Sequence, residues 1–115
     1  MGCIRNRMVI VHHYDKQKIQ KIREDAVRYF SKVVLEDNEY SAYDVGRDMI
    51  SPILTSIINE EYSFVIMGDC SKSGWDTSDL FEIKRNEWIK KWKKDKDSYL
   101  ILLVDFGEGY DAMIS

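Results

Sequence analysis

The chain has 115 residues, of which 44% are hydrophobic and 32% charged. This length fits one domain, here residues 1–115, and the balance is that of a folded globular protein rather than a disordered segment. The net charge of −3, with Lys and Arg mixed among Asp and Glu, excludes a strongly basic nucleic-acid-binding protein and an acidic mimic of DNA. No apolar run approaches the roughly 20 residues that span a bilayer.

Cysteine usage indicates the compartment. Cys3 and Cys70 are the two cysteines, too few for a disulfide scaffold, so we expect a reducing, cytoplasmic environment. Because no apolar run could span a bilayer, we also expect no membrane partner. Residues 1–7 lack the apolar stretch of a signal peptide, and we expect them to form a disordered leader. Gly2 beside Cys3 also suits an acylated terminus, although Asn6 stands where Ser or Thr is usual.

The first predicted elements are a strand and a helix. Residues 8–12 form a β-branched run typical of a buried strand. Asp15 can then cap a helix that runs to about residue 35. Alternation sends His12 and His13 to opposite faces of the strand, which does not suit a shared metal, although His12 could pair with a carboxylate. The apolar stripe of the helix is Ile19, Ile22, Ala26, Tyr29, Phe30 and Val33.

A second helical region is predicted over residues 41–59. Pro52 cannot lie in a helix interior, so we expect a break near residue 50 and a fresh start with Ser51 as the cap. A buried strand over residues 63–68 and a loop over 69–79 follow. The side chains expected to face inward from the second helix are Val45, Met49, Ile53, Leu54, Ile57 and Ile58.

Residues 80–94 allow two interpretations. One helix from Thr77 aligns Phe81, Trp88 and Trp92 but places Ile83 on the opposite face. Alternatively, residues 80–84 form a strand and a short helix begins near residue 86.

The C-terminal part predicts a hairpin. Residues 98–106 form a long strand that we expect to be central, Gly107 to Gly109 form the turn, and residues 110–114 return as the partner strand. The predicted fold is therefore an α+β two-layer sandwich of order β-α-α-β-(β)-α-β-β, with a mixed or antiparallel sheet ending in this hairpin.

One pattern suggests metal chemistry. Asp69 ends a predicted strand, and Glu82 and Lys84 would share one face of a strand over residues 80–84. This pattern resembles the metal-binding core of the PD-(D/E)xK nucleases, although the Pro expected before the Asp is missing. The resemblance implies that Asp69 and Glu82 bind Mg²⁺ while Lys84 orients water or the phosphate of a nucleic-acid substrate. In a chain rich in Lys and Glu, the same E-x-K is also typical of an ordinary solvated face.

A second pattern suggests protein binding. Trp75 lies in the polar loop beside acids, an arrangement that suits a binding hot spot, or equally a cap on an open end of the core. Small bacterial immunity proteins show a similar loop, an acid-led helix and paired tryptophans before a strand. The candidate binding residues are Asp69, Lys72, Trp75, Asp76 and Asp79.

Three hypotheses follow. The first is a cytoplasmic protein-binding module, an inhibitor of the immunity or phage anti-defence type that uses the acidic and aromatic loop and needs neither a cofactor nor catalytic residues. The second is a Mg²⁺-dependent nuclease using Asp69, Glu82 and Lys84, and it fails if residues 80–84 are helical. The third is an assembly subunit with its terminal hairpin as an exposed edge. The sequence leaves the partner and the oligomeric state open.

Overall fold

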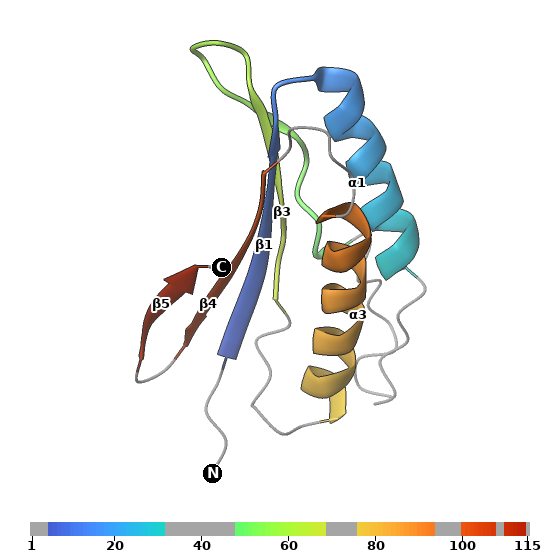
Figure 1. Ribbon diagram of the computed structural model, residues 1–115, viewed down its shortest axis with the longest axis vertical. Helices are drawn as coiled ribbons and strands as arrows, with labels where there is room; N and C mark the ends of the chain where they lie inside the picture. The colour runs from blue at the N-terminus through green and yellow to red at the C-terminus, as the bar shows by residue number, and fades with distance from the viewer. Residues whose placement is uncertain (1–4, 32–47, 69–75, 94–99, 108–109, 115) are drawn as a thin grey trace.

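The computed structural model describes residues 5–31, 48–68, 76–93, 100–107 and 110–114. Within them the chain is a small α+β domain with two helices and one five-stranded antiparallel sheet (Figure 1). No helix in these ranges is long and apolar enough to cross a membrane. The elements are β1 (Arg5–His13), α1 (Lys16–Phe30), β2 (Leu54–Thr55), β3 (Tyr62–Ile66), α3 (Asp76–Lys93), β4 (Leu100–Gly107) and β5 (Tyr110–Ile114).

The sheet has the order β2-β3-β1-β4-β5. Its middle strand is β1, whose Val11 pairs with Phe64 on one side and Ile101 on the other. Strand β4, which the sequence predicted to be central, is paired on both sides, with β1 and with β5, and lies next to the edge strand β5. The predicted C-terminal hairpin is confirmed as an antiparallel β4–β5 pair, in which Gly107 faces Tyr110.

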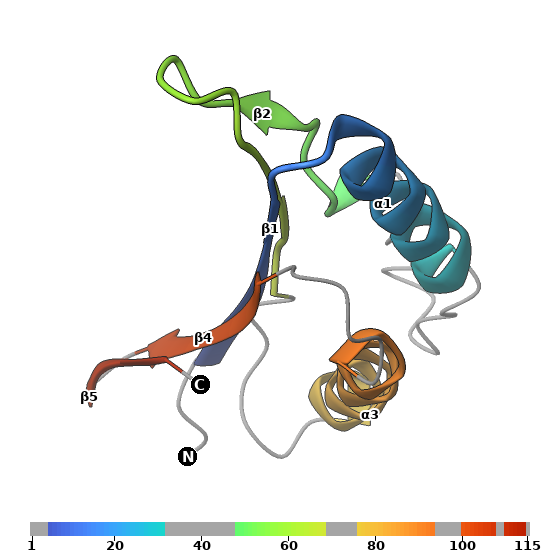
Figure 2. The ribbon, with the colours of Figure 1, turned by 45° about the horizontal axis from the view of Figure 1, so that its top comes forward.

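Both helices lie on the same side of the sheet (Figures 1 and 2). Alternation along β1 gives the sheet one apolar face, because Val9 and Val11 point to the same side and are fully buried beneath the helices. The predicted start of α1 is confirmed, since the Asp15 carboxylate accepts hydrogen bonds from the amides of Gln17 and Lys18. The predicted apolar stripe is buried at Ile19, Ile22, Ala26 and Phe30.

Helix α3 settles the ambiguity over residues 80–94. The whole of Asp76–Lys93 is helical, so the strand alternative over residues 80–84 is wrong. Helical spacing buries Phe81 and Trp88 against Phe30 of α1, and it leaves Ile83 on the solvent side. Phe30, Phe81 and Trp88 form one aromatic cluster. The burial of these rings favours a helix here, although the helix leaves Ile83 exposed.

A carboxylate joins the two helices. Asp25 of α1 accepts hydrogen bonds from the indole N–H groups of Trp88 at 3.1 Å and Trp92 at 2.8 Å, and from the Lys91 ammonium at 3.0 Å. Burial alone would raise the pKa of Asp25, but the bonds from Lys91, Trp92 and Trp88 together outweigh it and lower this pKa below its ordinary value. Asp25 thereby supplies an acceptor for the indole N–H groups of Trp88 and Trp92, which would be costly to leave without a hydrogen-bond partner.

The prediction that a helix restarts at Ser51 is wrong, because residues 51–59 are not helical. The Ser51 amide donates to the Val65 carbonyl at 2.9 Å, and the Ser51 hydroxyl accepts from the Val65 amide at 2.8 Å. These bonds draw the segment along β3 as an irregular edge, where Pro52 needs no amide partner. The short strand β2 forms there instead, and residues 41–47 of the predicted helix lie outside the described ranges.

The expectation of a disordered leader over residues 1–7 is wrong for residues 5–7. Arg5–His13 is one strand, so residues 5–7 belong to the sheet, while residues 1–4 lie outside the described ranges. Arg7 helps to hold residues 5–7 in the sheet, because its guanidinium donates a hydrogen bond to Asp105 of β4 at 3.0 Å and forms an ion pair with Glu82 of α3. Its side chain thereby connects the strand to two other elements.

Candidate functional site

The predicted loop surface lies largely outside the described part of the chain. This holds for Asp69, Lys72 and Trp75. Asp76 and Asp79 occupy the first turn of α3, not a loop.

The two described residues of the predicted nuclease site do not have the required arrangement. On helix α3, Glu82 and Lys84 are two residues apart and therefore point about 160° away from each other around the axis. Glu82 forms an ion pair with Arg7, and Lys84 lies 4.0 Å from Glu87 on the same helix. Within the described residues, no group of three or more His, Cys, Asp or Glu side chains could hold a metal ion. The strand geometry on which the nuclease hypothesis depends is therefore missing.

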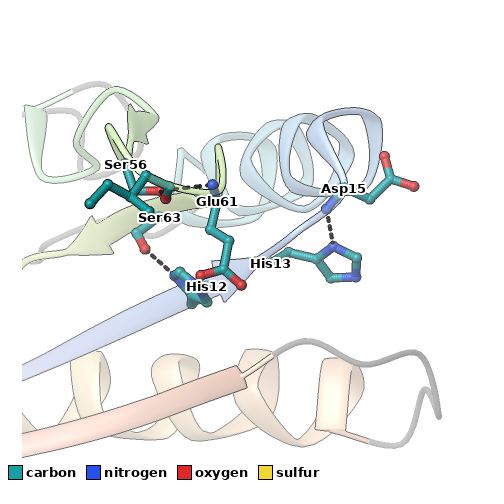
Figure 3. A network of polar contacts seen from close by, with 7 residues as sticks. His12, His13, Asp15, Ser56, Glu61 and Ser63 are labelled. Atoms are coloured by element: carbon teal, nitrogen blue, oxygen red, sulfur yellow. Dashed lines mark hydrogen bonds and ion pairs between the residues drawn. The ribbon is translucent and has the colours of Figure 1, made fainter.

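A different surface stands out at the turn between β2 and β3. We call residues 56–61 the hairpin tip. The Ser56 amide donates to the Glu61 carbonyl at 2.8 Å, and the Glu61 amide donates to the Ser56 hydroxyl at 2.8 Å (Figure 3). The same hydroxyl donates to the Ile58 carbonyl at 2.8 Å. Three hydrogen bonds through Ser56 thus fix the shape of the tip.

The backbone of the tip is also unusual. Asn59 and Glu60 have φ angles of 68° and 48°, in the left-handed region that favours glycine. Asn tolerates this region, but for Glu it costs on the order of 1–2 kcal/mol. The hydrogen bonds of the Ser56 side chain hold the turn in this strained conformation. Strained backbone conformations of this kind are concentrated at functional sites.

The tip presents apolar side chains to solvent. Ile57 is 99% exposed, Ile58 76% and nearby Leu54 of β2 65%, whereas the sequence predicted all three to face inward. Their i, i+3, i+4 spacing resembles a helix face, but the segment pairs with β3 instead. Adjacent exposed isoleucines on this hydrogen-bonded turn form an apolar patch without cover from the described residues.

A row of four side chains crosses the sheet beside the tip. Leu54, Ser63, His12 and Leu100 stand directly opposite one another on β2, β3, β1 and β4. Directly paired residues share a face, and His12 alternates with the buried Val11 and His13, so this row lies on the face away from the helices. We call it the cross-sheet row.

His12 connects the cross-sheet row to the tip. Its Nδ1 lies 2.5 Å from the Ser63 hydroxyl, and its Nε2 lies 3.6 Å from a carboxylate oxygen of Glu61. The Glu61 side chain extends from the tip toward the ring (Figure 3). The predicted pairing of His12 with a carboxylate is confirmed, although the sequence did not identify Glu61 as the partner.

Ser63, His12 and Glu61 have the composition of a hydrolytic triad but not its geometry. In such a triad the serine bonds Nε2 and the carboxylate orients Nδ1, whereas here the two nitrogens have exchanged roles. Ser63 also lies inside a strand paired on both sides, where the backbone amides serve the sheet rather than an oxyanion. The arrangement therefore joins the hairpin to β1 and lacks the geometry of an acyl-transfer triad.

The neighbouring His13 has a separate role on the other face. Its ring is buried, and its Nδ1 accepts a hydrogen bond from the Asp15 amide at 2.7 Å. The bond links the end of β1 to the N-cap of α1 (Figure 3). The two consecutive histidines thus serve different surfaces, as strand alternation predicts.

No protein family, curated protein or solved structure matches this chain.

Proposed function

We propose that this chain is a small protein-binding module that contacts its partner through the hairpin tip. The exposure of Ile57 and Ile58 on a turn fixed by Ser56 is the observation that carries this proposal. Exposed isoleucines are unfavourable in water unless another surface covers them. A rigid tip loses little conformational entropy on binding, so the apolar contact contributes more of its free energy to affinity.

In this proposal the helices and the sheet form a two-layer sandwich that supports the tip from one side. The module acts in the cytoplasm as an inhibitor of the immunity or phage anti-defence type. Such an inhibitor needs a compact framework and a protruding apolar contact that enters its target. The acidic and aromatic surface around Trp75, Asp76 and Asp79 is a second proposed contact, and it requires a separate variant to test.

The test is affinity capture from cells of the source organism with three purified chains. They are the wild type, the double variant Ile57→Ser/Ile58→Ser, and the control Ile83→Ser, which removes an exposed isoleucine from α3 on a different surface. We expect one partner that the wild type and the control retain equally and the double variant loses. Circular dichroism verifies that all three chains fold alike.

Two outcomes would contradict the proposal. Either the double variant retains the same partner as the wild type, or Ile83→Ser loses it to the same extent. A Trp75→Ala chain in the same experiment separates the surfaces. Loss of the partner from that chain alone moves the contact to residues 69–79 and overturns the role of the tip.

A further inference from the structure

We propose that the sheet face opposite the helices is the interface of a homodimer, in which two copies of this chain pack these faces against each other. Both helices lie on one side of the sheet, and no described helix or strand lies over the other side (Figures 1 and 2). The inference concerns the association of the chain with itself, so it does not rest on the proposed contact at the hairpin tip.

Strand register identifies the side chains on this face. Two rows of directly paired residues lie next to the cross-sheet row, one through Ile10 of β1 and one through Val104 of β4. Ile10 alternates with the buried Val9 and Val11, so both rows point away from the helices. We define the open face as these six residues, Met8, Ile10, Val65, Leu102, Val104 and Ile114.

The open face is apolar and uncharged. Its residues on β1, β3 and β4 are half-buried by their neighbours within the sheet, and Ile114 on the edge strand β5 is 67% exposed. The polar residues of β1 on this side, Asn6 and His12, lie at the two ends of the strand with Met8 and Ile10 between them. An apolar centre with polar residues at its margin is the usual composition of a protein interface.

The sequence of the two middle strands indicates that both of their faces are covered. An antiparallel sheet with one solvated face shows alternating apolar and polar residues. Residues 8–11 of β1 and residues 100–104 of β4 are instead continuous apolar runs. The helix side accounts for the burial of Val9, Val11 and Ile101. The other residues of each run require a cover that the described elements do not supply.

The size of the face fits a dimer interface. Five strands spaced about 4.8 Å apart, and the eight residues of β4 rising about 3.3 Å each, outline an area of roughly 500 Å². Side chains standing on the pleats add to this flat outline. A stable interface buries about 800 Å² per partner, so the whole sheet face, covered once, supplies an area of the required order.

A second copy provides a cover of matching chemistry. A two-fold axis sets the same face on both sides of the interface, so Ile10 on the middle strand meets the apolar centre of the other copy. The six uncharged residues can face themselves without the repulsion that like charges cause. Two sheets packed in this way lie about 10 Å apart with interdigitating side chains. The dimer would then have a core between the sheets and the helices on its outer surfaces.

The experiment is sedimentation equilibrium on the purified full chain over a range of protein concentrations. We expect the wild type to have twice the monomer mass. The double variant Ile10→Thr/Leu102→Thr keeps β-branched side chains that suit a strand but makes the centre of the face polar. We expect its dimer dissociation constant to rise at least about tenfold, because each substitution occurs twice in a symmetric interface. Circular dichroism verifies folding.

A matched pair of variants on β5 keeps the test decisive if the central variant does not fold. Ile114 and Met113 are adjacent and 67% and 61% exposed, but Met113 stands opposite Asp105 and points to the helix side. A lysine at either position leaves the monomer intact, since both side chains face solvent. We expect Ile114→Lys to weaken the dimer at least about tenfold and Met113→Lys to leave it unchanged.

Three outcomes would overturn the inference. The first is a wild type that stays monomeric up to about 100 μM, where an interface of this size should associate. The second is a folded central variant, or in its absence Ile114→Lys, that associates as tightly as the wild type. The third is equal weakening by Met113→Lys, or loss of the dimer in Ile57→Ser/Ile58→Ser, which would move self-association to the edge strand or to the hairpin tip. None of these readouts requires the partner sought in the capture experiment.

Discussion

The α1–α3 contact and the hairpin tip each combine apolar side chains with a hydrogen-bonding polar side chain, but the apolar side chains are buried in the first region and exposed in the second. Between the helices, Trp88 and Phe30 are fully buried and Asp25 satisfies the indole donors around it. At the tip, Ile57 and Ile58 face solvent, and the Ser56 hydroxyl shapes the turn that presents them. Polar groups stabilise burial in the first region and exposure in the second.

This difference separates residues that maintain the fold from residues available to a partner. Substitutions in the helix contact should lower stability and leave binding unaffected at temperatures where the chain remains folded. Substitutions of the exposed Ile57 and Ile58 should weaken binding and leave stability nearly unchanged. A variant that changes both properties equally would show that the two regions are not independent.

The largest effect is expected for Trp88→Ala. Removing a fully buried aromatic side chain leaves a cavity, and we expect the free energy of unfolding to fall by about 3–5 kcal/mol. Urea denaturation measures this fall. Ile83→Ser, on the exposed side of the same helix, should change stability by less than about 0.5 kcal/mol. Equal losses would show that α3 does not pack as described.

Asp25→Asn should have the next largest effect. Asn keeps one acceptor oxygen but loses the charge that attracts Lys91, so we expect a loss of about 1–3 kcal/mol at pH 7. Because the folded-state pKa of Asp25 is lowered, the carboxylate stabilises the fold above its unfolded pKa, near 3.8. This stability is lost as the pH falls through the folded-state pKa.

The difference between the wild type and Asp25→Asn should therefore shrink when denaturation is repeated at decreasing pH below about 3.8. A constant difference down to pH 2 would show that the carboxylate charge contributes nothing to the helix contact.

Ser56→Ala should have a smaller effect on stability. It removes the hydroxyl that bonds both the Glu61 amide and the Ile58 carbonyl, and we expect a loss of about 1 kcal/mol. Hydrogen exchange should show faster opening of the tip amides, with unchanged protection in α1. Unchanged exchange at the tip would mean that Ser56 does not organise the turn.

The smallest effect on stability is expected for Ile57→Ser. The side chain is almost fully exposed, so the free energy of unfolding should change by less than about 0.5 kcal/mol. Thermal denaturation compared with the wild type measures this. A loss above about 1 kcal/mol would mean that Ile57 packs within the domain and is not presented to a partner.

The sequence predicted the elements whose determinants are local. Asp15 and the stripe from Ile19 to Phe30 predict α1 because a cap and a helical period act within a few residues. Alternation correctly separated His12 from His13. The determinant at Ser51 is not local, since its bonds to Val65 form between residues distant in the chain.

The tip was missed for the same reason. The spacing of Leu54, Ile57 and Ile58 fits a helix face equally well, and only pairing of this segment with β3 turns these residues outward. Asn59 offered a weak turn signal, but Glu60 occupies the place where Gly usually follows Asn. Glu61 could be identified as the partner of His12 only after β1 and β3 were paired.

Site-specific photo-crosslinking tests whether the hairpin tip is the surface that contacts a partner. A benzophenone amino acid placed at position 57, and separately at position 83, is irradiated in cells of the source organism. We expect a single crosslinked protein from position 57 and none from position 83. Identical adducts from both positions, or none from position 57, would contradict it.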